Sequence, residues 1–374
     1  MRRIVVVVAI ALALIGCSGP KAQPPVAPSA PVTAPAAPTT PAEPVGAQPK
    51  APEPKVVAPT LPSNTVDVAW APDSRRLAVL TDTALLIIDG TSNRQETWPV
   101  TVGGETRLAG WRHDGQAVYV ATPRNALLQV QASGTVKEVV PAPQFQDPKY
   151  PVYFYYPSPA APVVIRQSGG KFQLIGGQGA WEGSFSAWSP AGKHFFYTSG
   201  QALRLVDLAS GQDTVTPVRG MPVWHPKGDS YLLVGAAECF VVSLKGGAPV
   251  KLPGAQGADW SADGSRIVYV DDVGFWTINA DGTNRQSLRP GRMESVWNLT
   301  WLVQDELVFL QSQKTPGVDT LLAPQLMAGG KVQPLPSGPN GVGVKLAVSP
   351  DRRRVAYIIL TTTVGAPGQL ALYP

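Results

Sequence analysis

The stretch that decides the fold reads WSADGSRIVYV and covers residues 260–270. It begins with a large ring, passes through a tight turn at Ser261–Gly264 and continues as a β-branched and aromatic strand at Arg266–Val270. The same phrase returns at intervals of 32 to 47 residues, with copies that start at Trp70, Trp111, Tyr156, Trp188, Trp224, Trp260, Trp301 and Val348. A period of this length predicts stacked supersecondary units, none of which can bury its apolar face alone.

One unit, at Gly257–Leu288, predicts a four-stranded antiparallel meander. Its strands are expected at Ala258–Trp260, Arg266–Val270, Gly274–Asn279 and Asn284–Leu288, with a hairpin at Asp281–Gly282. The second strand is apolar on both faces, which indicates a sheet packed between two other sheets. Radial stacking of small sheets gives a β-propeller, in which the tryptophan of each unit is expected to wedge between blades.

The number of blades and the closure of the ring follow from the two ends of the repeat region. Eight copies can be counted, but the copy at Tyr156 is degenerate, so the sequence allows seven or eight blades in an all-β domain at 55–374. The last unit supplies only three strands and ends in Gln369–Tyr373, while Lys55–Leu61 resembles the fourth strand of another unit. We predict that this N-terminal segment completes the last blade and removes the open sheet edges.

Residues 1–16 have the form of a secretory signal peptide, because Arg2 and Arg3 precede an apolar stretch, Ile4–Ile15, that is too short to cross a bilayer. The ending Leu14–Cys17 resembles the lipobox of bacterial lipoproteins. The resemblance implies lipidation of Cys17 and a membrane-anchored, extracytoplasmic protein. The lipid anchor would insert in the outer leaflet of the cytoplasmic membrane or in the periplasmic face of the outer membrane. The alternative is an ordinary exported protein.

The segment at 17–54 that follows is rich in proline and alanine. Fourteen of the 45 residues in Ser18–Pro62 are proline, which predicts a disordered, semi-rigid spacer. The formal net charge of +5 is mild, and no basic stripe or recognition motif is present, so a nucleic-acid partner is not expected. The basic cluster Arg352–Arg354 falls in a blade turn and is interpreted as a solvated loop.

No motif points to catalysis, a metal or a cofactor. The three histidines are His113 and His225, in turns after a repeat tryptophan, and His194, at the start of a second strand. There is no Gly-x-Ser-x-Gly elbow and no His-x-x-x-His or Cys-x-x-Cys pair. Cys239 lies in an apolar strand and is expected to be buried. We therefore expect a protein that is not an enzyme and uses no cofactor or metal.

The unit Trp-Ser-x-Asp-Gly-x-x-Ile-x-Tyr resembles the repeat of TolB-like and related WD-like β-propeller proteins. The match is best at residues 257–288 and is also good at 67–89 and 186–207. By repetition, the resemblance extends over the repeat region. It implies the propeller fold but carries no site residues and no activity, because such repeats mark a fold and not a function.

Three longer insertions mark candidate functional loops, at Gln144–Pro159, Arg289–Asn298 and Lys314–Ala328. Two of them contain aromatic residues that suit a partner site, namely Tyr150, Tyr153, Tyr155 and Trp297. The simpler alternative is that these loops fill gaps between irregular blades.

The expected function is that of a scaffold or accessory subunit that binds an envelope protein. The first alternative is a glycan- or small-ligand-binding protein, or a polysaccharide-acting enzyme, with its site at the central channel. The second is a degenerate peptidase propeller acting as a sensor. Acids lining the channel mouth would favour the first alternative, and an apolar patch on one face would favour the scaffold.

Overall fold

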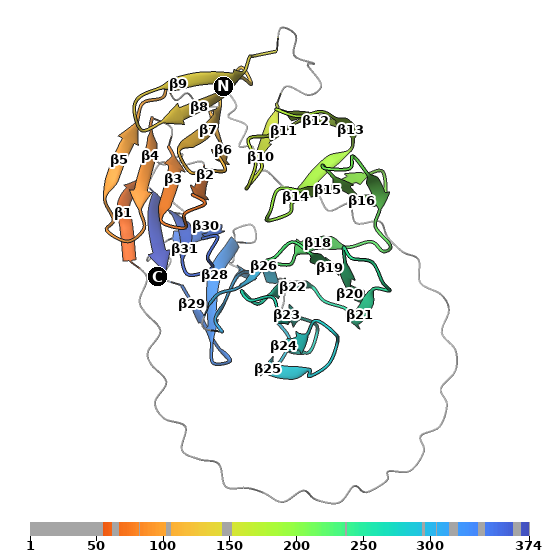
Figure 1. Cartoon of the computed structure of the whole chain (residues 1–374). Coiled ribbons are helices and arrows are strands. Elements are labelled where there is room, and N and C mark those ends of the chain that lie inside the picture. The colour runs from red at the N-terminus through yellow and green to blue at the C-terminus, as the bar shows by residue number, and fades with distance from the viewer. Residues whose placement is uncertain are drawn as a thin grey trace, which may run out of the picture. The chain divides into compact units, whose positions relative to one another are not determined.

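The computed structural model describes residues 55–61, 67–81, 83–101, 106–143, 152–235, 238–293, 296–303, 305–313, 321–335, 341–361 and 368–373. These residues form eight four-stranded antiparallel sheets, arranged as the blades of a ring (Figure 1). No helix occurs among them. The predicted all-β propeller is therefore confirmed with eight blades. The expected signal peptide, Cys17 and the Pro/Ala-rich segment lie outside the described residues.

Each blade is a meander whose first strand is innermost and whose fourth is outermost. The innermost strands are β2 (Asp67–Trp70), β6 (Arg107–Trp111), β10 (Phe154–Pro157), β14 (Ser184–Trp188), β18 (Met221–Trp224), β22 (Gly257–Trp260), β26 (Val296–Trp301) and β30 (Gly341–Val348). The second strands are β3 (Arg76–Leu80), β7 (Ala117–Ala121), β11 (Val164–Ser168), β15 (His194–Ser199), β19 (Ser230–Val234), β23 (Arg266–Val270), β27 (Leu307–Gln313) and β31 (Val355–Thr361).

The two outer layers complete the blades. The third strands are β4 (Leu85–Asp89), β8 (Leu127–Gln131), β12 (Lys171–Ile175), β16 (Ala202–Asp207), β20 (Glu238–Ser243), β24 (Gly274–Asn279), β28 (Leu321–Ala328) and β32 (Gly368–Tyr373). The outermost strands are β5 (Gln95–Trp98), β9 (Val136–Val140), β13 (Ala180–Glu182), β17 (Asp213–Val215), β21 (Val250–Pro253), β25 (Gln286–Pro290), β29 (Lys331–Pro334) and β1 (Lys55–Leu61). We number the blades 1 to 8 in the order of their innermost strands.

The ring is closed by the N-terminal strand, as predicted. Strand β1 pairs antiparallel with β32, with Lys55 opposite Leu372 and Leu61 opposite Gly368, in a sheet of order β1-β32-β31-β30. The two ends of the described chain are thus hydrogen-bonded within one blade, and no blade is left with only three strands. This arrangement ties ring closure to the pairing of residues more than 300 positions apart.

The alternating strand directions give the propeller two distinct faces. On the turn face, the innermost strands end, and tight turns such as 71–75, 112–116 and 261–265 lead into the second strands. On the loop face, the innermost strands begin, and connections between blades and between second and third strands are made. Lys55, where the described chain begins, lies at the turn face because β1 starts beside the end of β32.

The hydrophobic core consists of eight clusters, one between each pair of neighbouring blades. The second strands pack on both sides, so that Leu77–Leu80 and Ile267–Val270 are fully buried. This confirms that each sheet is sandwiched between two others. Cys239 is buried in the cluster between blades 5 and 6, as expected, and burial raises the pKa of its thiol to about 12.

The repeat tryptophans link four of the blades to the blade that precedes each of them. Four indole N–H groups donate to the carbonyl that precedes the equivalent tryptophan position of the preceding blade. These bonds are Trp70 to Ala347 at 3.0 Å, Trp111 to Ala69 at 2.8 Å, Trp188 to Tyr156 at 3.0 Å and Trp260 to Val223 at 3.2 Å. The register also corrects the third repeat. Pro157, opposite Val164 as Trp111 is opposite Val118, takes the tryptophan position that the sequence assigned to Tyr156.

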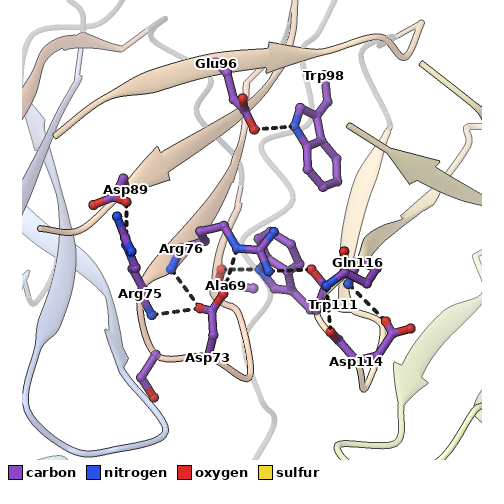
Figure 2. A network of polar contacts seen from close by, with 12 residues as sticks. Ala69, Asp73, Arg75, Arg76, Asp89, Glu96, Trp98, Trp111, Asp114 and Gln116 are labelled. Atoms are coloured by element: carbon purple, nitrogen blue, oxygen red, sulfur yellow. Dashed lines mark hydrogen bonds and ion pairs between the residues drawn. The ribbon is translucent and has the colours of Figure 1, made fainter. Parts of the chain in front are cut away.

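The turns link each blade to the one after it. Arg76 donates to the carbonyl of Gly115 at 2.7 Å, and its guanidinium lies 5.1 Å from the centre of the Trp111 ring (Figure 2). Arg354 of blade 8 makes the equivalent bond to the carbonyl of Ser74 in blade 1, which joins the last blade to the first. These residues therefore hold neighbouring turns together with bonds to backbone atoms.

A buried ion pair joins three blades at the end of the innermost strands. Arg352, in the turn of blade 8, donates to Asp259 in β22 at 2.7 Å and to the carbonyl of Trp301 in β26 at 3.2 Å. The same carboxylate accepts the backbone N–H of Trp301 at 2.9 Å. Because Arg352 and Arg354 bind other blades, the interpretation of Arg352–Arg354 as a solvated loop is wrong for these two. Only Arg353 is exposed.

Candidate binding face

Exposed apolar side chains are concentrated on the loop face. Seven large apolar residues of the described chain are exposed, and six of them lie where innermost strands begin, where outermost strands end or where second strands turn into third strands. These six are Val152, Phe154, Val215, Met221, Val273 and Trp297. They follow blades 3 to 7 around the ring. The seventh, Val136, lies at the start of β9 on the turn face.

The turn face has one exposed large apolar residue in the described chain, and several of its charged groups are paired with one another. Arg75 donates to Asp89 at 2.6 Å (Figure 2), and Arg112 donates to Asp114 at 2.6 Å. Donation from the Arg112 side chain lowers the pKa of the Asp114 carboxyl to about 2. Donation from the Ser261 hydroxyl does the same for Asp263. Ion pairs also occur on the loop face, at Lys171–Glu182 and Glu238–Lys251, so the two faces differ in their exposed apolar residues and not in charge pairing.

Two of the predicted partner-binding tyrosines meet around a buried asparagine. Asn125, between β7 and β8, is 1% exposed and adopts a positive φ of 62°. Its side-chain oxygen accepts from the backbone N–H of Tyr153 at 3.0 Å and from Arg107 at 2.8 Å. Its carbonyl accepts from the Tyr155 hydroxyl at 2.5 Å. Asn125 thus fixes the start of the innermost strand of blade 3 against blade 2.

The tyrosines differ in what they offer to a partner. The Tyr155 ring is buried between blades 2 and 3, which raises the pKa of its hydroxyl, so it is a core residue and not an exposed aromatic. Tyr153 is half-buried, with the Arg166 guanidinium 5.5 Å from its ring centre. Phe154 is exposed, with Arg107 5.6 Å from its ring centre. Tyr150 lies outside the described residues.

Trp297, the fourth predicted residue, is half-exposed at 49% near the start of β26. A register shift between Trp297 and Thr300 and a positive φ of 51° at Asn298 mark a bulge directly after it. Blade 7 lies four blades from blade 3 in the ring of eight, so Trp297 and Tyr153 share the loop face but lie on opposite sides of its centre.

Sequence reasoning missed Phe154, Met221 and Val273, which are among the exposed residues of this face. Met221 and Phe154 are the first residues of β18 and β10. The sequence did contain a signal for such residues. It is a large apolar residue at the start of an innermost strand, directly after an interblade connection. Its exposure depends on the neighbouring blade, which the repeat pattern does not describe.

Two of the three histidines pack against neighbouring blades or strands. The ring of His225 is buried, its Nε2 lies 3.2 Å from the carbonyl of Gly264, and it meets the Trp260 ring edge-on. His194 lies 3.5 Å from Asp207 and beside Trp224. Within the described ranges, no group of three or more His, Cys, Asp or Glu residues is placed to hold a metal ion. No helix in that part of the chain is long and apolar enough to span a membrane.

One of the two acids on the described innermost strands is not available to a ligand, and the other is Asp67, at the start of β2. Asp259, in an innermost strand, is buried, and burial raises the pKa of its carboxyl while the Arg352 guanidinium opposes that rise. Both oxygens of the carboxylate accept from Arg352. Comparison of the chain with protein-family models and with curated proteins finds no match. Function is therefore inferred from the residues of this chain alone.

Proposed function

We propose that this protein is a lipid-anchored, extracytoplasmic β-propeller that binds another protein of the cell envelope as a scaffold or accessory subunit. The observation that carries the proposal is the asymmetry of the two faces. Six of the seven exposed large apolar residues in the described chain lie on the loop face. Exposed apolar surface gathered on one face is the usual mark of a protein-binding surface.

The position of Lys55 supports this use of the loop face. The propeller is joined to the N-terminal segment at the turn face, so the proposed tether does not start on the apolar side. If Cys17 carries lipid, the 37 residues of Ser18–Pro54 would reach at most ~115 Å at roughly 3.1 Å per residue. The tether would then leave the loop face free to meet a partner away from the membrane.

The engagement of Asp259 by Arg352 weighs against the channel alternative. A glycan-acting site needs carboxylates that are free to contact substrate. The acid that this structure places on an innermost strand at blade 6 is used to join blades 6, 7 and 8. The observation removes Asp259 as a channel carboxylate and leaves Asp67, at the start of β2, as the other acid on the described innermost strands.

Site-specific photo-crosslinking in cells tests the proposal. A photoreactive phenylalanine analogue is placed at Trp297 or Val273 on the loop face, and at Val136 or Arg353 on the turn face, in the full chain. Val136 is the matched control because it is also an exposed apolar residue, at 43%. We expect one protein adduct from the loop-face positions and none from the turn-face positions. Equal adducts from both faces, or none from either loop-face position, would overturn the scaffold proposal.

The anchor is tested separately. Mass spectrometry of the mature N-terminus should find a diacylated cysteine at position 17, and Cys17→Ser should release the chain from the membrane fraction. An unmodified Cys17 in mature protein would refute the anchor without affecting the crosslinking result.

A further inference from the structure

A pocket of about 270 Å³ opens on the loop face between blades 4 and 5. It lies where β14, β15 and β16 of blade 4 meet the start of β18 in blade 5. Its polar lining comes from Ser186, Thr198, Gln201 and Arg219, and its apolar lining includes Met221 and Pro222. None of the described residues that line it carries a carboxylate. The pocket thus combines hydrogen-bonding groups, one cation and an apolar wall.

The segment that carries Arg219 is held in place by its neighbours. The Thr216 hydroxyl lies 3.1 Å from the carbonyl of Leu203 and 2.8 Å from that of Val218, which fixes the chain as it leaves β17. Gly220 packs against the backbone of blade 5, where a Cβ would lie 2.8 Å from the carbonyl carbon of Leu233. Both residues that flank Arg219 are therefore anchored, Val218 in the core between blades 4 and 5 and Gly220 against β19.

Arg219 itself has a charge that is not neutralised locally. It is exposed and makes no hydrogen bond or ion pair to any residue that the structure describes. Arg75, Arg112 and Arg76 on the turn face, by contrast, bind carboxylates or a neighbouring carbonyl. Next to it, Met221 is 57% exposed at the first position of β18. Methionine side chains adapt to different apolar groups, so they are frequent at peptide-binding surfaces.

We propose that this pocket binds a carboxylate-bearing peptide segment of the partner, with the carboxylate on Arg219 and an adjacent apolar side chain on Met221 and Pro222. Guanidinium and carboxylate form strong, charge-assisted bonds, and Ser186, Thr198 and Gln201 can satisfy the peptide's remaining polar groups. Among the described lining residues, no acid competes for Arg219. This inference deepens the proposed function and rests on it for the identity of the ligand's source.

The chain carries a built-in probe for this site. Besides Met1, it has three methionines. Met221 is exposed in the pocket, while Met293 and Met327 are buried in the cluster between blades 6 and 7. With ¹³C-methyl-labelled methionine in the full chain, the Met221 signal reports binding, and the other two report the integrity of the fold. Met221→Leu assigns the signal.

The titrants are N-acetyl-Leu-Glu-amide and its neutral counterpart, N-acetyl-Leu-Gln-amide. We expect the acidic peptide to shift the Met221 methyl signal in the millimolar range and the neutral peptide to bind about tenfold more weakly, as expected for the loss of a charged hydrogen bond. The Arg219→Gln variant should bind the acidic peptide only as weakly as it binds the neutral one. Arg292→Gln, at another exposed arginine of the loop face, should leave the affinity unchanged.

Equal binding of the two peptides, an unaffected Arg219→Gln variant, or no movement of the Met221 signal would overturn the inference. Free acetate that shifts the signal as strongly as the peptide would assign the pocket to small carboxylates and also contradict a peptide site. The outcome is separable from the proposed function. A partner that crosslinks at Trp297 while the peptide fails to bind refutes this pocket alone, and peptide binding without any crosslinked partner refutes the scaffold alone.

Discussion

The two faces of the propeller are built from the same repeat, but their side chains have different roles. On the turn face, arginines bind the carbonyls or carboxylates of neighbouring turns, and tryptophans donate to the preceding blade, so polar groups are used to hold the ring together. On the loop face, the innermost strands begin with residues as different as Phe154, Met221 and Gly257. The bonds that hold the blades together therefore lie mainly at the turn-face end of each blade. The residues at the loop-face end can vary, and they can form a binding surface.

The strongest test of this contrast replaces one tryptophan on each face. Trp260→Ala removes a ring that is 1% exposed and its bond to Val223, and it should cost about 4 kcal/mol of the free energy of unfolding. Trp297→Ala removes a half-exposed ring and should change that free energy by about 0.5 kcal/mol or less. Urea unfolding followed by circular dichroism measures both. Similar costs for the two variants would refute the division between faces.

The buried pair should give the next largest effect. Arg352→Met leaves the Asp259 carboxylate buried without its cation and should cost about 3 kcal/mol at neutral pH. Without the guanidinium, the pKa of Asp259 rises further above its unfolded value, so the variant gains a proton at low pH and loses stability as pH rises through that raised pKa.

The difference in unfolding free energy between the variant and the unaltered chain should therefore be larger at pH 8 than near pH 4. Adding Asp259→Asn to Arg352→Met should recover part of the loss, because no charge then remains buried. A difference that does not depend on pH would show that the pair does not act through the charge of Asp259.

A smaller effect is expected where the turns of two blades touch. Gly264 has a φ of 77°, and a Cβ there would lie 2.0 Å from Nε2 of His225 in the preceding blade. Gly211 has a similar φ of 70° and nothing within 4 Å of that position. Both substitutions by Ala should lower the free energy of unfolding by about 1 kcal/mol, because the backbone has a positive φ. Only Gly264→Ala must also displace His225, which should cost about 1–2 kcal/mol more. Equal thermal midpoints for the two variants would contradict this interblade contact.

The smallest effect concerns acid. The Ser261 hydroxyl holds the pKa of Asp263 at about 2, and Arg112 holds that of Asp114 there as well. Since these values lie below those of the unfolded chain, the stability they contribute is present above about pH 4 and is lost as pH falls toward 2. Asp263→Asn should flatten this loss by less than about 1 kcal/mol, because the group is exposed. The measurement is the thermal midpoint of the variant and of the unaltered chain between pH 2 and 6. If both midpoints fall equally with pH, the bond to Asp263 does not contribute.

Most of the architecture was predictable from the sequence, because repeat spacing, turn residues and strand patterns are properties of short segments. The period of the Trp-x-x-x-Gly phrase predicted the blades, and the missing fourth strand of the last unit predicted that Lys55–Leu61 would pair with Gln369–Tyr373. The degenerate third copy left the blade count at seven or eight. The position of its tryptophan equivalent was assigned one residue too early, because Pro157 has no aromatic ring to mark it.

Which side chains remain exposed once the blades are packed together depends on the tertiary structure and not on the local sequence. Tyr153 and Tyr155 look alike in the sequence, yet both contact Asn125 of the preceding blade, and the Tyr155 ring is buried between two sheets while Tyr153 is only half-buried. Arg352 reads as a turn residue, but it reaches an acid 93 positions away. Local chemistry determines a blade, whereas burial and charge pairing depend on neighbours that the ring brings together, and for that reason the loop face and its pocket emerge only from the assembled fold.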